Sequence, residues 1–212
     1  MSCPPFKTRH AILIVVLTLA TACGFWKVVI YPHVSPRRFH VVEAGAIYRS
    51  ADPTPTTLQI MHRRHGIRTV LDLGTFPRGS IDELRQQRTA EALGLQRFRF
   101  DLEGDSTGNP NAYVEALRIM ANPANHPVLV HCGAGTERTG LAVFLYRTIV
   151  QGRDSPSALA EARAVGHDPK RNPWLFIMLL EWHDKIEQAY RDGGSIPGVE
   201  PLRIETASTR SP

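Results

Sequence analysis

The sequence predicts an α/β fold with a central, mostly parallel sheet flanked by helices, and with an N-terminal hydrophobic segment before it. Short apolar runs alternate with helix-like runs over about residues 40–190, which is typical of a parallel or mixed sheet covered on both faces. The apolar run Pro127–Val130 enters a glycine-bearing loop, and that loop leads into the helix-like run Leu141–Arg147. The segment Ala11–Tyr31 is strongly apolar and precedes the recognisable core.

Four segments are expected to form strands. Ile67–Leu73 is a buried strand by its apolar content, whereas Leu95–Leu102 has alternating character. Val128–Val130 precedes the glycine loop and is expected at the centre of the sheet. The predicted strands in chain order are Ile47–Arg49, Ile67–Leu73, Leu95–Leu102 and Val128–Val130.

Six segments are expected to form helices. Pro55 lies in the first turn of the first helix and Gly66 at its end, and Gly94 closes the second helix. The apolar run Trp174–Leu180 is too short to cross a membrane and charged residues follow it, so it predicts a packed core helix. The predicted helices are Thr54–His65, Ile81–Leu93, Asn111–Met120, Thr139–Gln151, Ser155–Val165 and Pro173–Tyr190.

The N-terminal segment allows two interpretations. Ala11–Tyr31 has 21 residues, about one bilayer span, with Trp26 near the interface. Alternatively, Ala11–Ala20 is the hydrophobic region of a signal peptide that is cleaved after Ala22, which would leave Cys23 first, as in a bacterial lipoprotein. The basic residues on the two flanks do not decide the orientation, and the signal-like layout favours export of the folded domain.

Composition narrows the possible classes of function. The 212 residues, 42% of them hydrophobic, suit one domain with short additions, and the net charge of +5 comes from scattered basic residues. A nucleic-acid-binding protein would concentrate such residues on one face, so nucleic acid is not an expected partner. Cys132 is the only cysteine of the folded part, so no disulfide is expected there. The nine histidines lack metal-ligand spacing, and neither a metal nor another cofactor is expected.

The residues with the most specific chemistry form one run, His131-Cys132-Gly133-Ala134-Gly135-Thr136-Glu137-Arg138-Thr139-Gly140. Its glycines can turn backbone N–H groups inward, and the helix that follows adds its unpaired N-terminal N–H groups. Arg138 supplies a planar fork that can grip two phosphate oxygens. The residues expected to bind a phosphate are therefore Gly133, Ala134, Gly135, Thr136, Glu137 and Arg138.

Cys132 is predicted to be a nucleophile. A free cysteine titrates near ~8.5, and an electropositive loop can lower that pKa to roughly 3.5–7.5, which favours the thiolate. A thiolate beside a bound phosphate can attack the phosphorus atom. The hydroxyl of Thr139 can hydrogen-bond the sulfur as Cys132 leaves the phosphoenzyme. His131 is expected to support the loop through backbone hydrogen bonds and not to act as a base.

At these residues the chain resembles the cysteine-dependent protein tyrosine phosphatase superfamily, whose signature is His-Cys-x5-Arg-Ser/Thr. It looks closest to the compact dual-specificity-like branch, including its bacterial members. The segments Ile47–Pro53, Gly66–Leu73 and Asp105–Pro110 look like the entry segment, the early core strand and the general-acid loop of that branch. The resemblance covers about residues 40–190 and implies hydrolysis of phosphotyrosine or phosphoserine/threonine proteins through a phosphocysteine.

Cleavage of a phosphate ester also needs a proton donor for the departing oxygen. Asp105 is the favoured candidate because it lies in a polar, glycine-flanked loop that can carry a carboxyl group over the phosphate, and the resemblance aligns it with the family's acid. Asp101, nearer the strand end, is the rival and Glu103 the third choice. Asp72 ends an apolar strand and is expected to make a structural hydrogen bond.

Glu137 is unusual because it puts a negative charge inside a phosphate loop. It is expected to point to solvent or to pair with an arginine such as Arg49 or Arg78. Phosphoinositide-directed relatives tend to carry basic residues in this loop, and the variable positions here have none. A highly charged inositol phosphate is therefore disfavoured as substrate.

The predicted organisation has four parts: a membrane anchor or signal segment over residues 1–31, a linker over 32–40, a phosphatase domain over 41–192 and a flexible tail over 193–212. Two alternatives to a protein phosphatase remain open, a phosphatase for lipid or small-molecule phosphates and a non-catalytic phosphate-binding domain.

Overall fold

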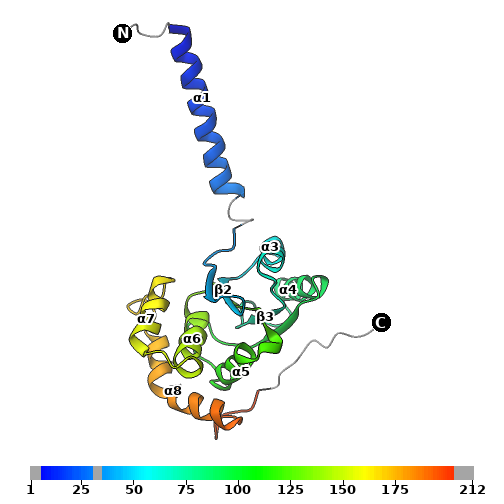
Figure 1. Ribbon diagram of the computed structural model, residues 1–212, viewed down its shortest axis with the longest axis vertical. Coiled ribbons are helices and arrows are strands. Elements are labelled where there is room, and N and C mark those ends of the chain that lie inside the picture. The colour runs from blue at the N-terminus through cyan, green and yellow to red at the C-terminus, as the bar shows by residue number, and fades with distance from the viewer. Residues whose placement is uncertain (1–5, 31–34, 203–212) are drawn as a thin grey trace. The chain divides into compact units, whose positions relative to one another are not determined.

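The computed structural model describes residues 6–30 and 35–202, which fall into two compact units, Met1–Ser35 and Pro36–Pro212. The N-terminal unit is the helix α1 (Phe6–Phe25), followed by one π-helical turn, η1 (Trp26–Ile30) (Figure 1). Within it, His10–Val28 is long and apolar enough to cross a membrane, with 19 residues and a mean hydropathy of 2.1. The expected hydrophobic segment is thus helical as far as Ile30, and Tyr31 lies outside the described residues.

The second unit is built on a five-stranded sheet with the order β1-β2-β5-β3-β4. Its strands are β1 (His40–Glu43), β2 (Ile47–Ala51), β3 (Thr69–Asp72), β4 (Gln96–Arg99) and β5 (Val128–Cys132). Only β1 runs antiparallel to its neighbour, and all other pairs are parallel. The predicted mostly parallel sheet is confirmed, with the strand before the glycine loop at its centre.

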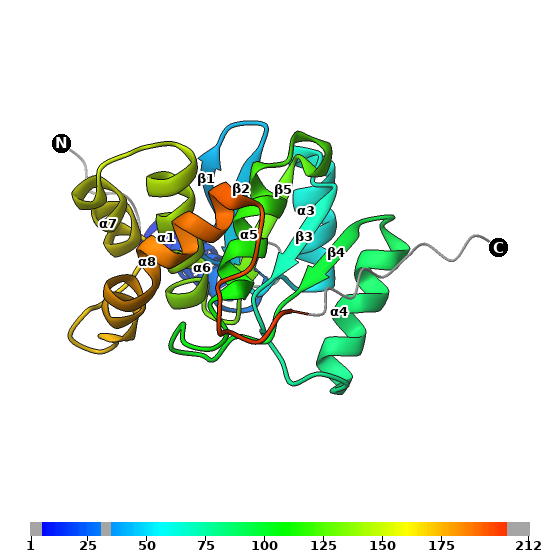
Figure 2. The same cartoon turned by 90° about the horizontal axis from the view of Figure 1, so that it is seen from below.

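Helices cover both faces of the sheet (Figures 1 and 2). One face carries α3 (Pro55–His65) and α4 (Ile81–Ala92). The other carries α5 (Asn111–Ala121), α6 (Glu137–Leu145) with the π-helical turn η3 (Tyr146–Val150), α7 (Ser155–Ala164) and α8 (Trp174–Asp192), while a short 3-10 turn, η2 (Pro123–Asn125), precedes β5. Along β5, Leu129 packs with α3 and α4, whereas Val128 and Val130 pack with α5 and α6, because successive side chains of a strand alternate between faces.

The helix ends follow the sequence signals closely. Thr54 caps α3, its side chain accepting a hydrogen bond from the Thr57 N–H at 3.2 Å, and Gly66 ends the helix at a φ of +66°. The helix after the glycine loop begins at Glu137, two residues earlier than predicted. Arg138 therefore lies in the first helical turn and not in the loop proper.

The folded unit extends beyond the predicted start of the domain at residue 41. Residues 37–39 were expected in the linker, but the Arg37 carbonyl accepts a hydrogen bond from the Ala51 N–H at 2.8 Å and Phe39 stacks on Tyr48. The strand β1 was not predicted, and it pairs with β2 from His40 onward. It is a four-residue edge strand with little buried apolar surface, so its sequence carries a weak signal.

The first part of the predicted flexible tail is also packed. Ile196 is buried and its N–H donates to the Asn111 side chain at 2.8 Å. The Glu200 carbonyl accepts hydrogen bonds from Asn109 at 2.7 Å and from Asn111 at 3.1 Å. Residues 193–202 thus belong to the folded unit, because Asn109, in the turn before α5, and Asn111, in α5, bind the backbone of this segment. Residues 203–212 lie outside the described part of the chain.

Candidate active site

The strand order brings the predicted nucleophile to the carboxyl edge of the sheet. Cys132 is the last residue of β5 and lies opposite Ala51 of β2, while His131 lies opposite Asp72 of β3. Open parallel sheets bind ligands at this edge, where the strand order puts loops from several strands side by side. The loop after β5 is therefore flanked by the segments that follow β2 and β3.

Three consecutive carbonyl groups of this loop are held from outside. The Gly133 carbonyl accepts from the Asp52 N–H at 3.2 Å, the Ala134 carbonyl from the Arg38 guanidinium at 2.9 Å, and the Gly135 carbonyl from the Arg49 guanidinium at 2.8 Å. The C=O and N–H of one planar peptide unit point in opposite directions, so carbonyls held outward leave the following N–H groups facing into the loop.

The inward direction is visible at the cysteine, where the Gly135 N–H donates to Cys132 Sγ at 3.2 Å. Sγ belongs to a residue that is 2% exposed. The inward Gly135 N–H is the kind of donor that a phosphate loop needs, and phosphate binding by this loop stays a prediction.

Gly135 is required by the close approach of β2. Its φ is +72°, and a Cβ there would lie 2.6 Å from both the Ala51 nitrogen and the Ser50 carbonyl oxygen. We expect Gly135→Ala to lower the free energy of unfolding by about 2–4 kcal/mol, because alanine adds both a left-handed backbone and a backbone overlap. Chemical denaturation checks this against Gly194→Ala, where nothing lies within 4 Å. Equal midpoints for the two variants would contradict the close approach of β2 to the loop.

Arg49 is a buried cation beneath the loop. Burial lowers the pKa of Arg49 to about 10, and the negative charges of Glu161 and Cys132 oppose that shift, so the guanidinium stays protonated at neutral pH. Among the described residues, its Nε and one terminal nitrogen have no hydrogen-bond partner. Arg49 therefore adds a positive charge near Cys132 as well as holding the Gly135 carbonyl.

Arg138 ties the loop to its two neighbouring segments. One terminal nitrogen donates to the Leu73 carbonyl at 3.1 Å, to the Leu102 carbonyl at 3.2 Å and to the Gly74 carbonyl. The other terminal nitrogen lies 3.7 Å from the position that a Cβ on Gly133 would take. Nε is buried and has no partner among the described residues. One edge of the fork is thus fixed by carbonyls, while Nε lacks an acceptor.

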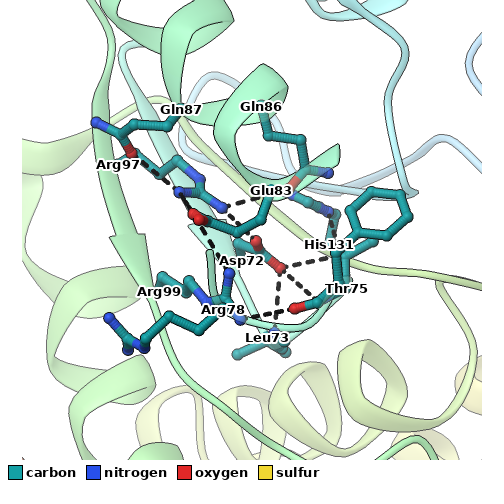
Figure 3. A network of polar contacts seen from close by, with 12 residues as sticks. Asp72, Leu73, Thr75, Arg78, Glu83, Gln86, Gln87, Arg97, Arg99 and His131 are labelled. Carbon is teal, nitrogen blue, oxygen red and sulfur yellow. Dashed lines mark hydrogen bonds and ion pairs between the residues drawn. The ribbon is translucent and has the colours of Figure 1, made fainter. Parts of the chain in front are cut away.

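A buried polar network supports the loop from the α3 and α4 face (Figure 3). Asp72 is fully buried and accepts from Arg97 at 2.7 Å, from the Thr75 N–H and hydroxyl at 2.9 Å each, and from the Gly74 N–H at 3.1 Å. Burial raises the pKa of Asp72, but the charge of Arg97 and the hydrogen bonds from Thr75 outweigh it and hold the pKa below its usual value. The predicted structural role of Asp72 fits these contacts.

His131 joins this network. Its Nδ1 lies 3.3 Å from the Thr75 hydroxyl, and since that hydroxyl donates to Asp72, the ring nitrogen must be the donor. The His131 carbonyl accepts from the Leu73 N–H at 2.9 Å. Burial lowers the pKa of His131 to about 4, against the pull of Asp72, so the ring is neutral at pH 7. The support expected from backbone bonds is thus joined by a side-chain bond.

The raised pKa of Asp52 makes the free energy of unfolding depend on pH. Burial, with the nearby charge of Asp72, raises the pKa of Asp52 from 3.8 to about 6, although a hydrogen bond from Gln86 opposes the shift. Between these values the folded state holds more protons than the unfolded state, so this residue's contribution to stability falls as pH rises and then stays constant above about pH 6.

We therefore expect Asp52→Asn to stabilise the protein at pH 7.5 by about 1–2 kcal/mol and to leave its stability unchanged below about pH 4. Urea denaturation at a series of pH values measures the difference from the parent chain. The exposed Asp192→Asn serves as control and should give no such pH-dependent gain. A gain for Asp52→Asn that does not change with pH would contradict the raised pKa.

The candidate proton donors differ sharply in their surroundings. Asp101 accepts from Arg78 at 2.9 and 3.0 Å and from Arg99 at 2.6 and 3.0 Å. Burial raises its pKa, but the bonds and charges of Arg99 and Arg78 outweigh that effect and hold the pKa below its usual value. Asp101 therefore carries no proton to give at neutral pH. Glu103 is exposed. Asp101 and Glu103 both line a hollow of about 540 Å³ that Arg138 also lines.

Among the described residues, Asp105 is bound by its own loop and not by arginines. Its carboxylate accepts from the Thr107 N–H at 2.9 Å and from the Thr107 hydroxyl at 2.7 Å, which fixes a local turn. The fully buried Tyr113 donates to the next carbonyl, that of Ser106, at 2.8 Å. Burial and then the charge of Cys132 raise the pKa of Tyr113 well above its usual value, so its hydroxyl remains a donor and anchors the loop of Asp105.

Glu137 does not pair with Arg49 or Arg78, as the sequence suggested. Its carboxylate meets His167 Nδ1 at 2.7 Å, and His167 comes from the segment between α7 and α8. Arg49 and Arg78 are engaged elsewhere, with the Gly135 carbonyl and with Asp101. The predicted alternative of a solvent-facing carboxylate is also wrong, since the Glu137 side chain is 15% exposed.

One group on α8 has ligand atoms close enough to consider a metal ion. His183, Asp184 and Glu187 place one such atom each within 4.8 Å of one another. His183 is already occupied, with Nδ1 3.2 Å from Asp184 and Nε2 3.2 Å from the Thr148 hydroxyl. Both ring nitrogens of His183 thus have a polar neighbour in the structure.

A central parallel strand that ends in a cysteine, a glycine loop and an arginine at the start of a helix defines the class of cysteine-dependent phosphatases. The chain belongs to the tyrosine phosphatase family, whose model matches residues 33–170. The resemblance inferred from the sequence motif is confirmed at this level.

Curated relatives include inositol diphosphatases and a dual specificity protein phosphatase. Inositol diphosphatase SIW14 of Saccharomyces cerevisiae is 29% identical over 123 residues, which cover 55% of this chain and 41% of the relative. Inositol diphosphatase DSP1 of rice is 33% identical over 122 residues, which cover 55% of this chain and 51% of the relative. Dual specificity protein phosphatase TpbA of Pseudomonas aeruginosa is 27% identical over 149 residues, covering 70% and 62%. The chain spans about half the length of the curated relatives it matches.

Solved structures share the fold. The core catalytic domain of SIW14 in complex with citrate superposes with a TM-score of 0.60 at 24% identity, over 74% of this chain and 94% of that one. TpbA with a C132S substitution and bound phosphotyrosine gives a TM-score of 0.58 at 22% identity, over 75% and 99%. The predicted α/β architecture is thereby confirmed.

Proposed function

We propose that the chain hydrolyses phosphate monoesters through a phosphocysteine intermediate. The observation that carries the proposal is the loop itself, which combines an inward N–H group and a buried cysteine sulfur with, in the helix turn that follows, an arginine Nε without an acceptor among the described residues. Phosphate oxygens would accept hydrogen bonds from that Nε and from one terminal nitrogen of Arg138. The other terminal nitrogen would keep its hydrogen bonds to backbone carbonyls such as that of Leu73. The backbone groups from Gly133 to Arg138 would bind the remaining oxygens.

In the first step, the Cys132 thiolate attacks phosphorus and the bond to the departing oxygen breaks. Asp105 gives its proton to that oxygen, so the leaving group departs as an alcohol or phenol. The pairing of Asp101 with two arginines supports Asp105 over its rival. In the second step, Asp105 takes a proton from water, the water oxygen bonds to phosphorus, and the sulfur leaves as thiolate.

Thr139 supports the return of the thiolate. Its hydroxyl is fully buried and has no hydrogen-bond partner among the described residues. A donor that lacks an acceptor costs free energy, and a sulfur that becomes negative supplies the acceptor. His131 contributes by fixing the loop and not by proton transfer, in agreement with its neutral, buried ring.

The favoured substrate is a phosphorylated protein. The loop positions between Cys132 and Arg138 carry no lysine or arginine, and nearby Arg78 and Arg99 both bind Asp101. A highly phosphorylated ligand needs several available cations, so this arrangement favours a single phosphate. The dual specificity relative TpbA supports the same class, whereas the inositol diphosphatase relatives support an inositol phosphate as the second candidate.

A substrate panel tests the proposal. The full chain in mild detergent is given phosphotyrosyl and phosphoseryl peptides, inositol phosphates and p-nitrophenyl phosphate, and released phosphate is measured. Peptide hydrolysis well above that of inositol phosphates is the expected result, and the reverse order identifies the second candidate. Phosphate binding without release from any member identifies a non-catalytic phosphate-binding domain and overturns the proposal.

The same chain is anchored to a membrane by the apolar helix, with the phosphatase domain on the exported side. The support is the length and hydropathy of His10–Val28. Alkaline extraction of membranes from expressing cells tests this, since a spanning helix stays with the lipid. N-terminal sequencing tests the alternative of a cleaved signal, and protease treatment of intact cells tests the orientation.

A further inference from the structure

A partly buried contact joins the start of α6, directly after the phosphate loop, to the segment between α7 and α8. His167 Nδ1 and the Glu137 carboxylate are 2.7 Å apart, and the two side chains are 0% and 15% exposed. A carboxylate only accepts, so the imidazole must donate. Glu137 immediately precedes Arg138, the residue proposed to hold the phosphate, in the first turn of α6.

The imidazole is fixed on several sides. The His167 N–H donates to the Ala162 carbonyl at the end of α7 at 3.1 Å, and its ring lies 5.8 Å from the ring of Phe176 in α8. The preceding Gly166 packs so closely that a Cβ there would meet the Thr136 methyl at 3.3 Å. These contacts hold His167 beside the loop.

A carboxylate at this place needs such a donor. The loop, Arg49 and Arg138 are arranged to attract an anion, and an unrestrained glutamate would be drawn toward the same positive charges. It would then oppose a phosphate both by like charge and by occupying its donors. Within the described part of the chain, no lysine or arginine pairs with Glu137, which leaves His167 as its partner.

We propose that His167 is a positioning residue that holds the Glu137 carboxylate away from the phosphate site. The inference deepens the proposed function and rests on its assignment of the loop as the phosphate site. Its consequence is that anion affinity, and not only stability, depends on a histidine 30 residues away in the chain.

The experiment uses the full chain in four forms: parent, His167→Ala, Glu137→Gln and the double variant. Kinetics with p-nitrophenyl phosphate give kcat and KM, and calorimetry gives the affinity for inorganic phosphate. We expect His167→Ala to raise KM and weaken phosphate binding by about 5- to 20-fold, an effect that shrinks at high salt because it is electrostatic. The double variant should recover to within about twofold of Glu137→Gln, since no carboxylate remains to be held.

Two further variants separate positioning from simple support. His167→Asn keeps a donor near the place of Nδ1 and should stay within about threefold of the parent. His183→Ala removes another histidine that meets a carboxylate, Asp184, and should not change phosphate affinity. If His167→Ala fails to fold, His167→Phe takes its place, because it keeps a ring beside Phe176 and cannot donate.

The proposal is overturned if the double variant binds phosphate as weakly as His167→Ala, or if His167→Ala binds as tightly as the parent. Phosphate binding reports on the pair even when no substrate turns over. A failure of this inference can therefore be told apart from a failure of the proposed hydrolytic function.

Discussion

Cys132→Ser is expected to reduce hydrolysis of p-nitrophenyl phosphate by more than about 10³-fold while phosphate binding persists. Serine is a weak nucleophile at its ordinary pKa, and His131, the adjacent imidazole, points to Thr75 and cannot act as its base. The N–H groups and Arg138 remain in place, so the anion still binds. Initial rates measure the first effect and calorimetry with inorganic phosphate the second.

Cys23→Ser is the matched control, because Cys23 is the other free cysteine of the described residues and is exposed on α1. It should retain the parent rate. Comparable hydrolysis by Cys132→Ser and the parent would exclude a covalent mechanism through this sulfur.

Asp105→Asn is expected to lower kcat by about 10²–10³-fold, since a positioned acid contributes about 10²–10⁴-fold. The loss should be greater with phenyl phosphate than with p-nitrophenyl phosphate, because the more basic phenoxide depends more on a proton from the enzyme. The carboxylate geometry set by Thr107 survives in the amide, which keeps an oxygen acceptor. Steady-state kinetics with both substrates measure the loss.

Asp101→Asn is the paired comparison, and it should change kcat by less than about fivefold. Asp101 is already ionised by Arg78 and Arg99, so no proton donor is removed. If Asp101→Asn shows the larger and leaving-group-dependent loss, the assignment of the acid is reversed.

Much of the fold follows from local signals. The strands after residue 66 and all the α-helices of the second unit have apolar patterns, caps or glycine ends that are visible in the sequence, and each observed element lies close to its predicted position. The edge strand β1 escaped prediction because its pairing with β2 supplies most of its order. The packing of Ile196 also escaped, since it depends on Asn111, which is far away in the chain.

The active-site loop shows a similar division. Cys132, Arg138 and the intervening glycines are recognisable because their spacing is itself the signal. The residues that hold the loop from outside cannot be recognised in the sequence, because Arg38 and Arg49 are 96 and 86 positions away from the residues whose carbonyls they bind. The only available hint is that Arg49 lies two residues after Ile47, and so on the same face of a buried strand, where a charged side chain needs a reason.

The partner of Glu137 was predicted wrongly for the same reason. An arginine is the usual partner of a carboxylate, and the isolated His167 has no periodic or spacing signal in the sequence. Tyr113 is equally hidden, since an aromatic residue on the buried face of a helix looks like ordinary core. Long-range pairs of this kind are defined by how helices and loops pack, which the local sequence does not encode.

The hydrogen bond from Arg38 to the Ala134 carbonyl has a practical meaning for protein engineering. The folded unit begins at Pro36, only two residues before that arginine. A shortened version cut at the first strand residue, His40, would keep the whole sheet and yet release one of the three carbonyls that are held on the outer side of the loop after β5. Expression boundaries for this protein should therefore be drawn ahead of Pro36, so that a shortened protein which folds but works poorly is not mistaken for an inactive family member.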